Sequence, residues 1–73
     1  MNSIGNKETV QGIILERLPD LKFRVSLGSG KEVIAYLGGK MKLHRIQLLI
    51  NDKVLVILDP YKGHATNRIV RRV

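Results

Sequence analysis

The 73-residue sequence contains no cysteine, no tryptophan and only three other aromatic residues, Phe23, Tyr36 and Tyr61. The absence of cysteine excludes disulfides and thiolate metal sites, so folding has to rely on nonpolar packing, as is usual in a reducing compartment. Every nonpolar run is far too short to span a bilayer, and the first residues lack the nonpolar stretch of a secretory signal. We therefore expect a cytoplasmic protein with no membrane partner.

Acidic residues are also scarce. Six aspartates and glutamates are outnumbered by thirteen lysines and arginines, which gives a net charge of +7. On so small a surface this charge creates a positive field that attracts polyanions. The composition therefore favours a nucleic-acid partner over an anionic membrane or a merely solvated surface.

The remaining polar residues offer no candidate for catalysis or metal binding. His44 and His64 lie far apart in the chain, and the acidic residues do not cluster at the spacing of metal ligands. No serine has a histidine and an aspartate in a plausible catalytic arrangement. The segment Gly28-Ser29-Gly30 resembles a fragment of a phosphate-binding loop, but it leads into a strand rather than a helix. We expect neither an enzyme nor a cofactor.

Residues 22–37 predict a β-hairpin around which the rest of the chain is organised. Nonpolar residues at the odd positions alternate with Lys22, Arg24 and Ser26, the period of a strand with one buried and one exposed face. The glycine-flanked turn Gly28-Ser29-Gly30 then leads into a second β-rich run. One face of this hairpin should belong to the core, and the other should be cationic.

The rest of the sequence predicts a small all-β domain. Further strands are expected over residues 9–18, 53–58 and 68–73, with one helical turn within residues 39–44. Gly12 predicts a bulge or sharp bend in the first strand. Residues 1–7 predict a flexible tail, and residues 8–73 a single domain. Five short strands with one short helical turn between strands three and four indicate a five-stranded OB-fold β-barrel of the S1-like RNA-binding type, with an SH3-like barrel as the alternative.

The strand over residues 53–58 has nonpolar residues on both faces, because Leu55 and Ile57 alternate with a nonpolar set on the other side. Either neighbouring chain covers this second face, which is the simpler interpretation, or the strip is exposed for a protein partner.

Basic residues gather in three places where an OB-fold binds its ligands. The predicted RNA-binding residues are Lys22, Arg24 and Tyr36 on strands two and three, Lys40, Lys42 and Arg45 after strand three, and Arg68, Arg71 and Arg72 on the last strand. Such clusters can neutralise several phosphates and release their counterions. Because single-strand binders stack bases on several aromatic side chains, the few aromatics here favour recognition of folded RNA by its shape and backbone.

A series of short motifs resembles bacterial-type translation initiation factor 1, from about residue 8 to residue 72. In chain order they are Gln11-Gly12, Leu15-Glu16, Leu18-Pro19, Phe23-Arg24-Val25, Gly39-Lys40-Met41-Lys42, Asp52-Lys53-Val54, Pro60-Tyr61 and Arg68-Ile69-Val70. By this resemblance, Lys40 and Lys42 fall in the basic loop of the family, and Arg68 and Arg72 on its basic last strand. The chain departs from the family pattern at Leu43 and Gln47, where basic residues are common, and at Arg45 and Arg71, where aromatics are common.

The resemblance implies an OB-fold protein that binds the decoding (A) site of the small ribosomal subunit, where it contacts decoding-region rRNA and a neighbouring ribosomal protein. It implies that the protein acts with the other two initiation factors to block premature tRNA entry. We expect a monomer in the bacterial cytoplasm, or in the plastid stroma if the protein is organellar. The competing hypotheses are a general cold-shock-like RNA-binding chaperone and a protein-interaction module that uses the Leu55 and Ile57 strip.

Overall fold

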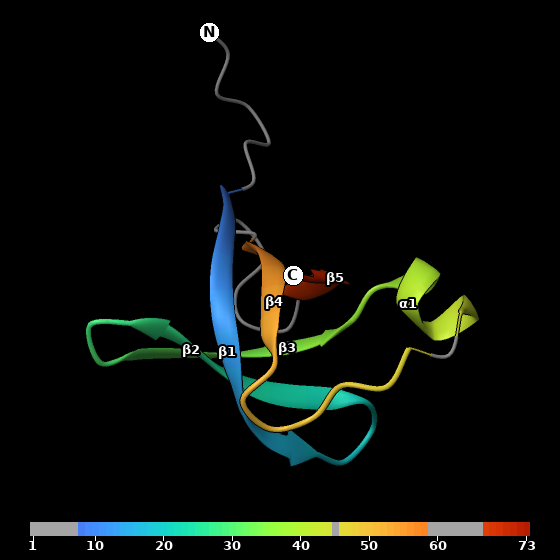
Figure 1. Ribbon diagram of the computed structural model, residues 1–73, viewed down its shortest axis with the longest axis horizontal. Helices are drawn as coiled ribbons and strands as arrows, with labels where there is room; N and C mark the ends of the chain where they lie inside the picture. The colour runs from blue at the N-terminus through green and yellow to red at the C-terminus, as the bar shows by residue number, and fades with distance from the viewer. Residues whose placement is uncertain (1–7, 45, 59–66) are drawn as a thin grey trace, which may run out of the picture.

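The computed structural model describes residues 8–44, 46–58 and 67–73, which form five strands and one short helix (Figure 1). The elements are β1 (Glu8–Leu18), β2 (Lys22–Gly28), β3 (Lys31–Leu37), α1 (Gly39–Leu43), β4 (Lys53–Leu58) and β5 (Arg68–Arg72). The strands form a closed barrel in the order β1-β2-β3-β5-β4. The predicted all-β, five-stranded OB-fold with one helical turn between the third and fourth strands is confirmed. The predicted tail, residues 1–7, lies outside the described residues.

The barrel closes because β1 is long enough to pair with two strands in succession. Its first half, from Glu8 to Ile13, pairs antiparallel with β4, and its second half, from Ile13 to Leu18, pairs antiparallel with β2. The ladder with β2 shifts register between Ile14 and Glu16. A bulge at this point bends the strand and increases its twist, which lets one strand belong to both sides of the barrel.

Of the bulge or sharp bend predicted at Gly12, the bulge is not found at this residue. Gly12 pairs in regular register with Val54 of β4, and the irregularity lies further along the strand. The glycine is needed because β2 comes close: a Cβ atom on Gly12 would lie 2.4 Å from Cγ1 of Val25. A glycine inside a strand marks either a bulge or a close approach, and here it marks the second.

The interior of the barrel is filled by the nonpolar residues that alternate along the strands. The buried set is Ile14, Phe23, Val25, Val33, Ala35, Leu37, Met41, Leu48, Val54, Val56 and Ile69. The predicted assignment of Phe23 to the core is confirmed, since its side chain is 5% exposed. Met41 and Leu48 are the core residues outside the strands, and they fasten α1 and the following segment to the barrel.

Two turns among the first three strands place non-glycine residues in the left-handed region, as the turn before β4 does with Asn51 at φ 78°. In the predicted hairpin turn, Ser29 lies at φ 53° between Gly28 at 91° and Gly30 at 76°. Asp20 at 65° and Leu21 at 59° form the turn between β1 and β2. Both turns confirm the sequence prediction of tight connections, which make the first three strands a meander.

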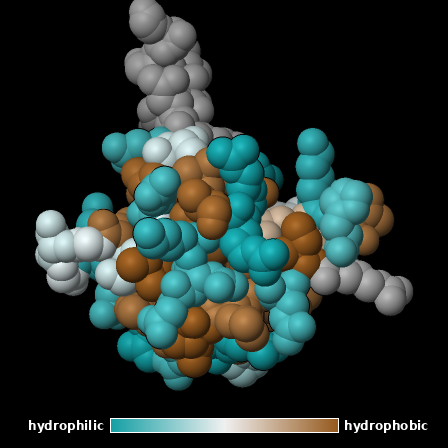
Figure 2. All heavy atoms as spheres, in the orientation of Figure 1, coloured by the Kyte–Doolittle hydropathy of each residue, from teal (hydrophilic) through white to brown (hydrophobic). Residues whose placement is uncertain are grey.

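The nonpolar strip on β4 is half-buried. Leu55 and Ile57 both show intermediate exposure, and their cross-strand partners on β5 are Arg71 and Arg68. The strip is therefore flanked by basic residues on the β5 side and by Gln11 and Thr9 on the β1 side. On the face that Figure 2 shows, hydrophobic side chains are interspersed with hydrophilic ones.

Candidate nucleic-acid interface

A cationic groove lies between α1 and β5. It consists of two adjoining hollows, of about 490 and about 340 Å³, which share Lys40, Met41 and Val70. The first is also lined by Arg68, and the second by His44, Arg71 and Arg72. Lys40 and the three arginines of β5, predicted separately from two distant segments, thus lie along one groove, which we call the α1–β5 groove.

The backbone brings α1 close to β5. The N–H of Gly38, which precedes α1, donates a hydrogen bond to the carbonyl oxygen of Ile69 at 2.8 Å. A Cβ atom on Gly38 would lie 2.9 Å from the same oxygen, so only glycine allows this approach without a shift of the strand. Met41, 2% exposed, packs into the core and fixes the rotation of the helix.

The fixed rotation of α1 separates its two lysines. Residues in an α-helix are about 100° apart, so the positions on either side of buried Met41 point to opposite flanks. Lys40 lines the α1–β5 groove, whereas Lys42 lines a different hollow at the end of the barrel. The helix therefore presents positive charge on both flanks.

The last strand carries a bulge that the sequence does not reveal. Val56 pairs with Ile69 and Leu55 with Arg71, so Val70 is an extra residue between them. A bulge changes the direction in which the following side chains point, and here it leaves Val70 in the floor of the groove with Arg71 and Arg72 beside it. Arg72 donates a hydrogen bond from Nη1 to the carbonyl oxygen of Gln47 at 3.2 Å, which ties β5 to the segment after α1.

Three of the predicted residues form a row across three strands. Lys22 on β2 pairs with Tyr36 on β3, and Tyr36 pairs with Arg68 on β5. Neighbouring strands lie about 4.8 Å apart, so these outward positions fall within about 10 Å of one another. Because Arg68 also lines the α1–β5 groove, the row connects the face of β2 and β3 to that groove.

Arg24, one of the predicted RNA-binding residues, forms ion pairs within the protein. Its Nη2 is hydrogen-bonded to Oε1 of Glu16, and its Nη1 lies 3.8 Å from Oε1 of Glu32. All three side chains are about half exposed. The register causes this arrangement, because Arg24 pairs with Glu16 on one side and its neighbour Ser26 pairs with Glu32 on the other. The two carboxylates, which the sequence reasoning did not single out, compensate the charge of Arg24.

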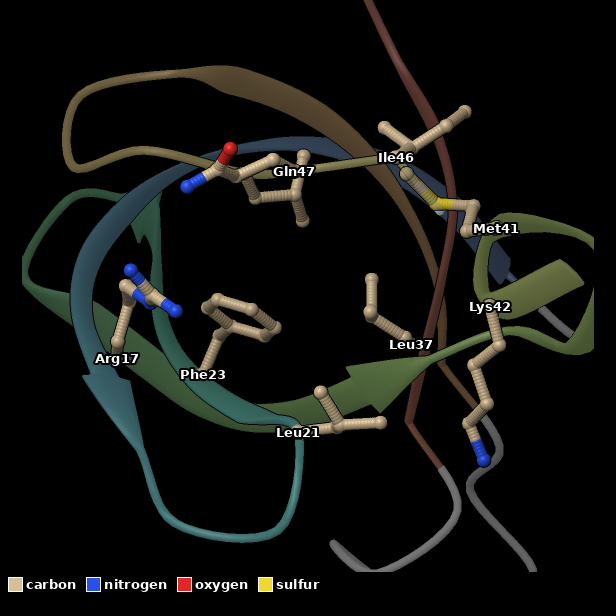
Figure 3. Close-up of a pocket in the computed structure, with 9 residues that line it drawn as sticks. Arg17, Leu21, Phe23, Leu37, Met41, Lys42, Ile46 and Gln47 are labelled. Carbon is tan, nitrogen blue, oxygen red and sulfur yellow. The ribbon is translucent and has the colours of Figure 1, made fainter. Parts of the chain in front are cut away.

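The open end of the barrel contains a third hollow, of about 320 Å³ (Figure 3). Phe23 and Leu37 point into it from the barrel wall, and Leu21 lies at its edge. Arg17 and Lys42 are the basic residues that line it. It was not predicted, because it depends on how the segment after α1 returns across the barrel.

Of the predicted site residues, Arg45 lies outside the described residues, as do Tyr61 and His64. Within the described part of the chain, no three His, Asp or Glu side chains lie together as a metal site would require. The helix in that part has five residues, too few to cross a bilayer. The groove offers several cations around a small nonpolar floor, an arrangement that can neutralise phosphates.

The comparisons with known proteins agree with this picture. A family model for translation initiation factor 1A / IF-1 matches residues 2–73. The solution structure of translation initiation factor 1 from the Wolbachia endosymbiont strain TRS of Brugia malayi is similar, with a TM-score of 0.77 and 35% sequence identity over 92% of this chain and 78% of that one. YjeQ from Thermotoga maritima has a TM-score of 0.69 at 16% identity, over 90% of this chain and 23% of that one, a likeness of fold alone.

Proposed function

Because the chain belongs to the translation initiation factor 1A / IF-1 family, we propose that it binds the decoding (A) site of the small ribosomal subunit and keeps tRNA out of that site during initiation. The family assignment makes it an RNA-binding translation initiation factor. We further propose which site it occupies and with which residues. It includes the other two initiation factors as partners, a contact with a neighbouring ribosomal protein, and a monomer in the bacterial cytoplasm or the plastid stroma.

The observation that carries this proposal is the α1–β5 groove. Lys40, Arg68, Arg71 and Arg72 line it together, and no carboxylate of the described residues lines either of its hollows. Fixed cations without a compensating acid bind RNA phosphates and release the counterions of the RNA. Phosphate contacts of this kind position a protein on its RNA without reading sequence, which suits a protein that occupies one site on a folded RNA.

The proposed mechanism is steric and electrostatic. The groove, extended by the row of Lys22, Tyr36 and Arg68, holds the barrel on decoding-region rRNA, and the bulk of the barrel excludes tRNA. No group is transferred and no bond is broken, so the protein acts without enzymatic chemistry. Arg24 contributes less to this contact than the sequence suggests, because Glu16 and Glu32 already bind it.

The competing function, a general single-strand RNA chaperone, has less support. Chaperones of the cold-shock type stack bases on several exposed aromatic side chains. Phe23 is buried in the core at 5% exposure, and Tyr36 is half-buried on the outer face of β3. A stacking platform built from described residues would therefore consist of Tyr36 alone.

Binding of labelled protein to purified small and large ribosomal subunits over a salt series, with and without the other two initiation factors, tests the proposal. We expect saturable binding to small subunits, strengthened by the other factors and weakened by salt. Equal affinity for both subunits and for random RNA would favour the chaperone.

Two variants test the groove itself. Lys40→Gln and Arg71→Gln should each weaken binding and reduce the slope of log K against log salt by about 0.7–0.9 for each lost phosphate contact. Lys31→Gln is the matched control, because it removes the same charge at the β2–β3 turn, on the opposite side of the molecule from α1 (Figure 1). If Lys31→Gln weakens binding as much as the groove variants, net charge rather than the groove holds the RNA.

A further inference from the structure

Leu43, the last residue of α1, is 76% exposed. The other large nonpolar side chains that are exposed in the described part of the chain range from 36% to 56%. Single exposed nonpolar residues are ordinary on protein surfaces, so exposure alone does not assign a role to Leu43. Its position on α1 supplies the further argument.

The helix points Leu43 away from the barrel. Residues two apart in an α-helix lie about 200° apart around its axis, so Leu43 is nearly opposite Met41, which is buried in the core. Lys40 and Lys42 occupy the two flanks between them. Lys40 lies beside β5, and Lys42 lies beside the hollow at the open end of the barrel. In Figure 1, α1 stands out at the edge of the molecule. The outermost point of this element is thus a nonpolar side chain with a lysine on each side.

We infer that Leu43 is an RNA-contact residue whose side chain becomes buried against the ribose and base surface of ribosomal RNA when the lysines of α1 engage phosphates. The inference rests on the proposed function and adds to it a contact that does not depend on charge. Sugar and base faces present nonpolar area between the phosphates of an RNA strand, and burial of a leucine there adds affinity that salt does not screen.

The lysines favour RNA over a protein surface as the occupant. The buried centres of protein–protein interfaces are depleted of lysine, because its ammonium group is strongly hydrated. Leu43 has Lys40 and Lys42 on its two flanks. It can be buried in a protein interface only if both ammonium groups are paired with acidic groups or remain hydrated. An RNA strand supplies a negatively charged partner for each ammonium group, because it carries phosphates along its whole length.

The test is the affinity of Leu43→Ala for purified small ribosomal subunits, measured at several salt concentrations with and without the other two initiation factors. Loss of the leucine should weaken binding by about tenfold at every salt concentration, because the three carbons that alanine lacks would be partly buried in the complex. The slope of log K against log salt should stay the same, because no charge is lost. The free energy of unfolding should not change, since the side chain is 76% exposed. Ile50→Ala is the matched control, because Ile50 is also exposed, at 56%, and lies outside α1.

The outcomes separate this inference from the proposed function. Unchanged affinity of Leu43→Ala together with weakened binding of Lys40→Gln would overturn the inference and leave the proposed function standing. Unchanged affinity of all the variants, including Arg71→Gln, would remove both. A loss in Leu43→Ala that appears only when the other initiation factors are present would show a protein contact, and it would overturn the inference. A loss with an altered salt slope would do the same, because it would show that the phosphate contacts had moved.

Discussion

Gly12 lies in β1 at a point where β2 leaves no room for a side chain. A Cβ atom on Gly12 would lie 2.4 Å from Cγ1 of Val25, 3.0 Å from the carbonyl oxygen of Ser26 and 3.2 Å from Cδ2 of Leu27. Val25 is 0% exposed, and its branched side chain has few alternative rotamers in a packed core. We therefore predict that Gly12→Ala destabilises the protein.

Two opposing contributions determine the size of the effect. Gly12 has no positive φ, so alanine fits the backbone, and the less flexible unfolded chain would by itself stabilise the protein by about 0.4–1 kcal/mol. Overpacking a filled core costs about 1–3 kcal/mol. The clash is larger, and the net loss should be about 1–2 kcal/mol, which for a domain of this size lowers the Tm by roughly 5–15 °C.

Urea unfolding followed by circular dichroism measures this loss. Gly12→Ala should lower the midpoint without changing the m-value. In a Val25→Ala background the same substitution should cost less, because the atom 2.4 Å from the new Cβ is gone. An equal cost in both backgrounds, or a Gly12→Ala variant as stable as the parent, would refute the reasoning that a close approach to Val25 requires this glycine.

Two other predictions concern carboxylates. Replacing Glu16 and Glu32 together by glutamine should release Arg24, which would raise the affinity for random RNA and steepen the slope of log K against log salt by up to about 0.9. Because these ion pairs are exposed, the free energy of unfolding should change by less than about 1 kcal/mol. An unchanged slope would mean that Arg24 does not reach phosphate. Asp52→Ala should lower the free energy of unfolding by about 1 kcal/mol, because Oδ2 of Asp52 accepts the N–H of Leu49 at 2.9 Å. Asp52→Asn keeps an acceptor oxygen and should lose less, and equal losses in urea unfolding would contradict the hydrogen-bond explanation.

The strands were predictable because their signals are local. Alternation of nonpolar and polar residues is set within one strand, and it predicted the hairpin of β2 and β3 and the strand over residues 53–58 with the observed bounds. Glycine at Gly28 and Gly30 predicted the hairpin turn, where both have positive φ. Such features do not depend on which strand lies next to which.

The features that were missed depend on register between distant segments. The salt bridges of Arg24 require Glu16 on β1 and Glu32 on β3 to flank β2, and the bulge at Val70 exists only relative to β4. The bulge predicted as one possibility at Gly12 was wrong for the same reason, since one sequence cannot tell a bulge from a close approach of another strand. The groove itself depends on the approach of Gly38 to β5.

Because Glu16 and Glu32 compensate the charge of Arg24, positive charge is distributed unevenly over the surface of the barrel. Glu16 and Glu32 lie beside Arg24 on the outer face of β1, β2 and β3, whereas the α1–β5 groove is lined by cations and by no carboxylate of the described residues. Without these glutamates the surface around Arg24 would attract RNA in addition to the groove and its extension at Lys22 and Tyr36, and the protein would bind in more orientations. At physiological salt, charges are screened beyond about 8 Å, so each face acts on the surface next to it rather than through net charge. Under the proposed function, in which the groove supplies affinity, the two glutamates restrict the orientation of binding, and their removal should favour random RNA more than it favours the small subunit.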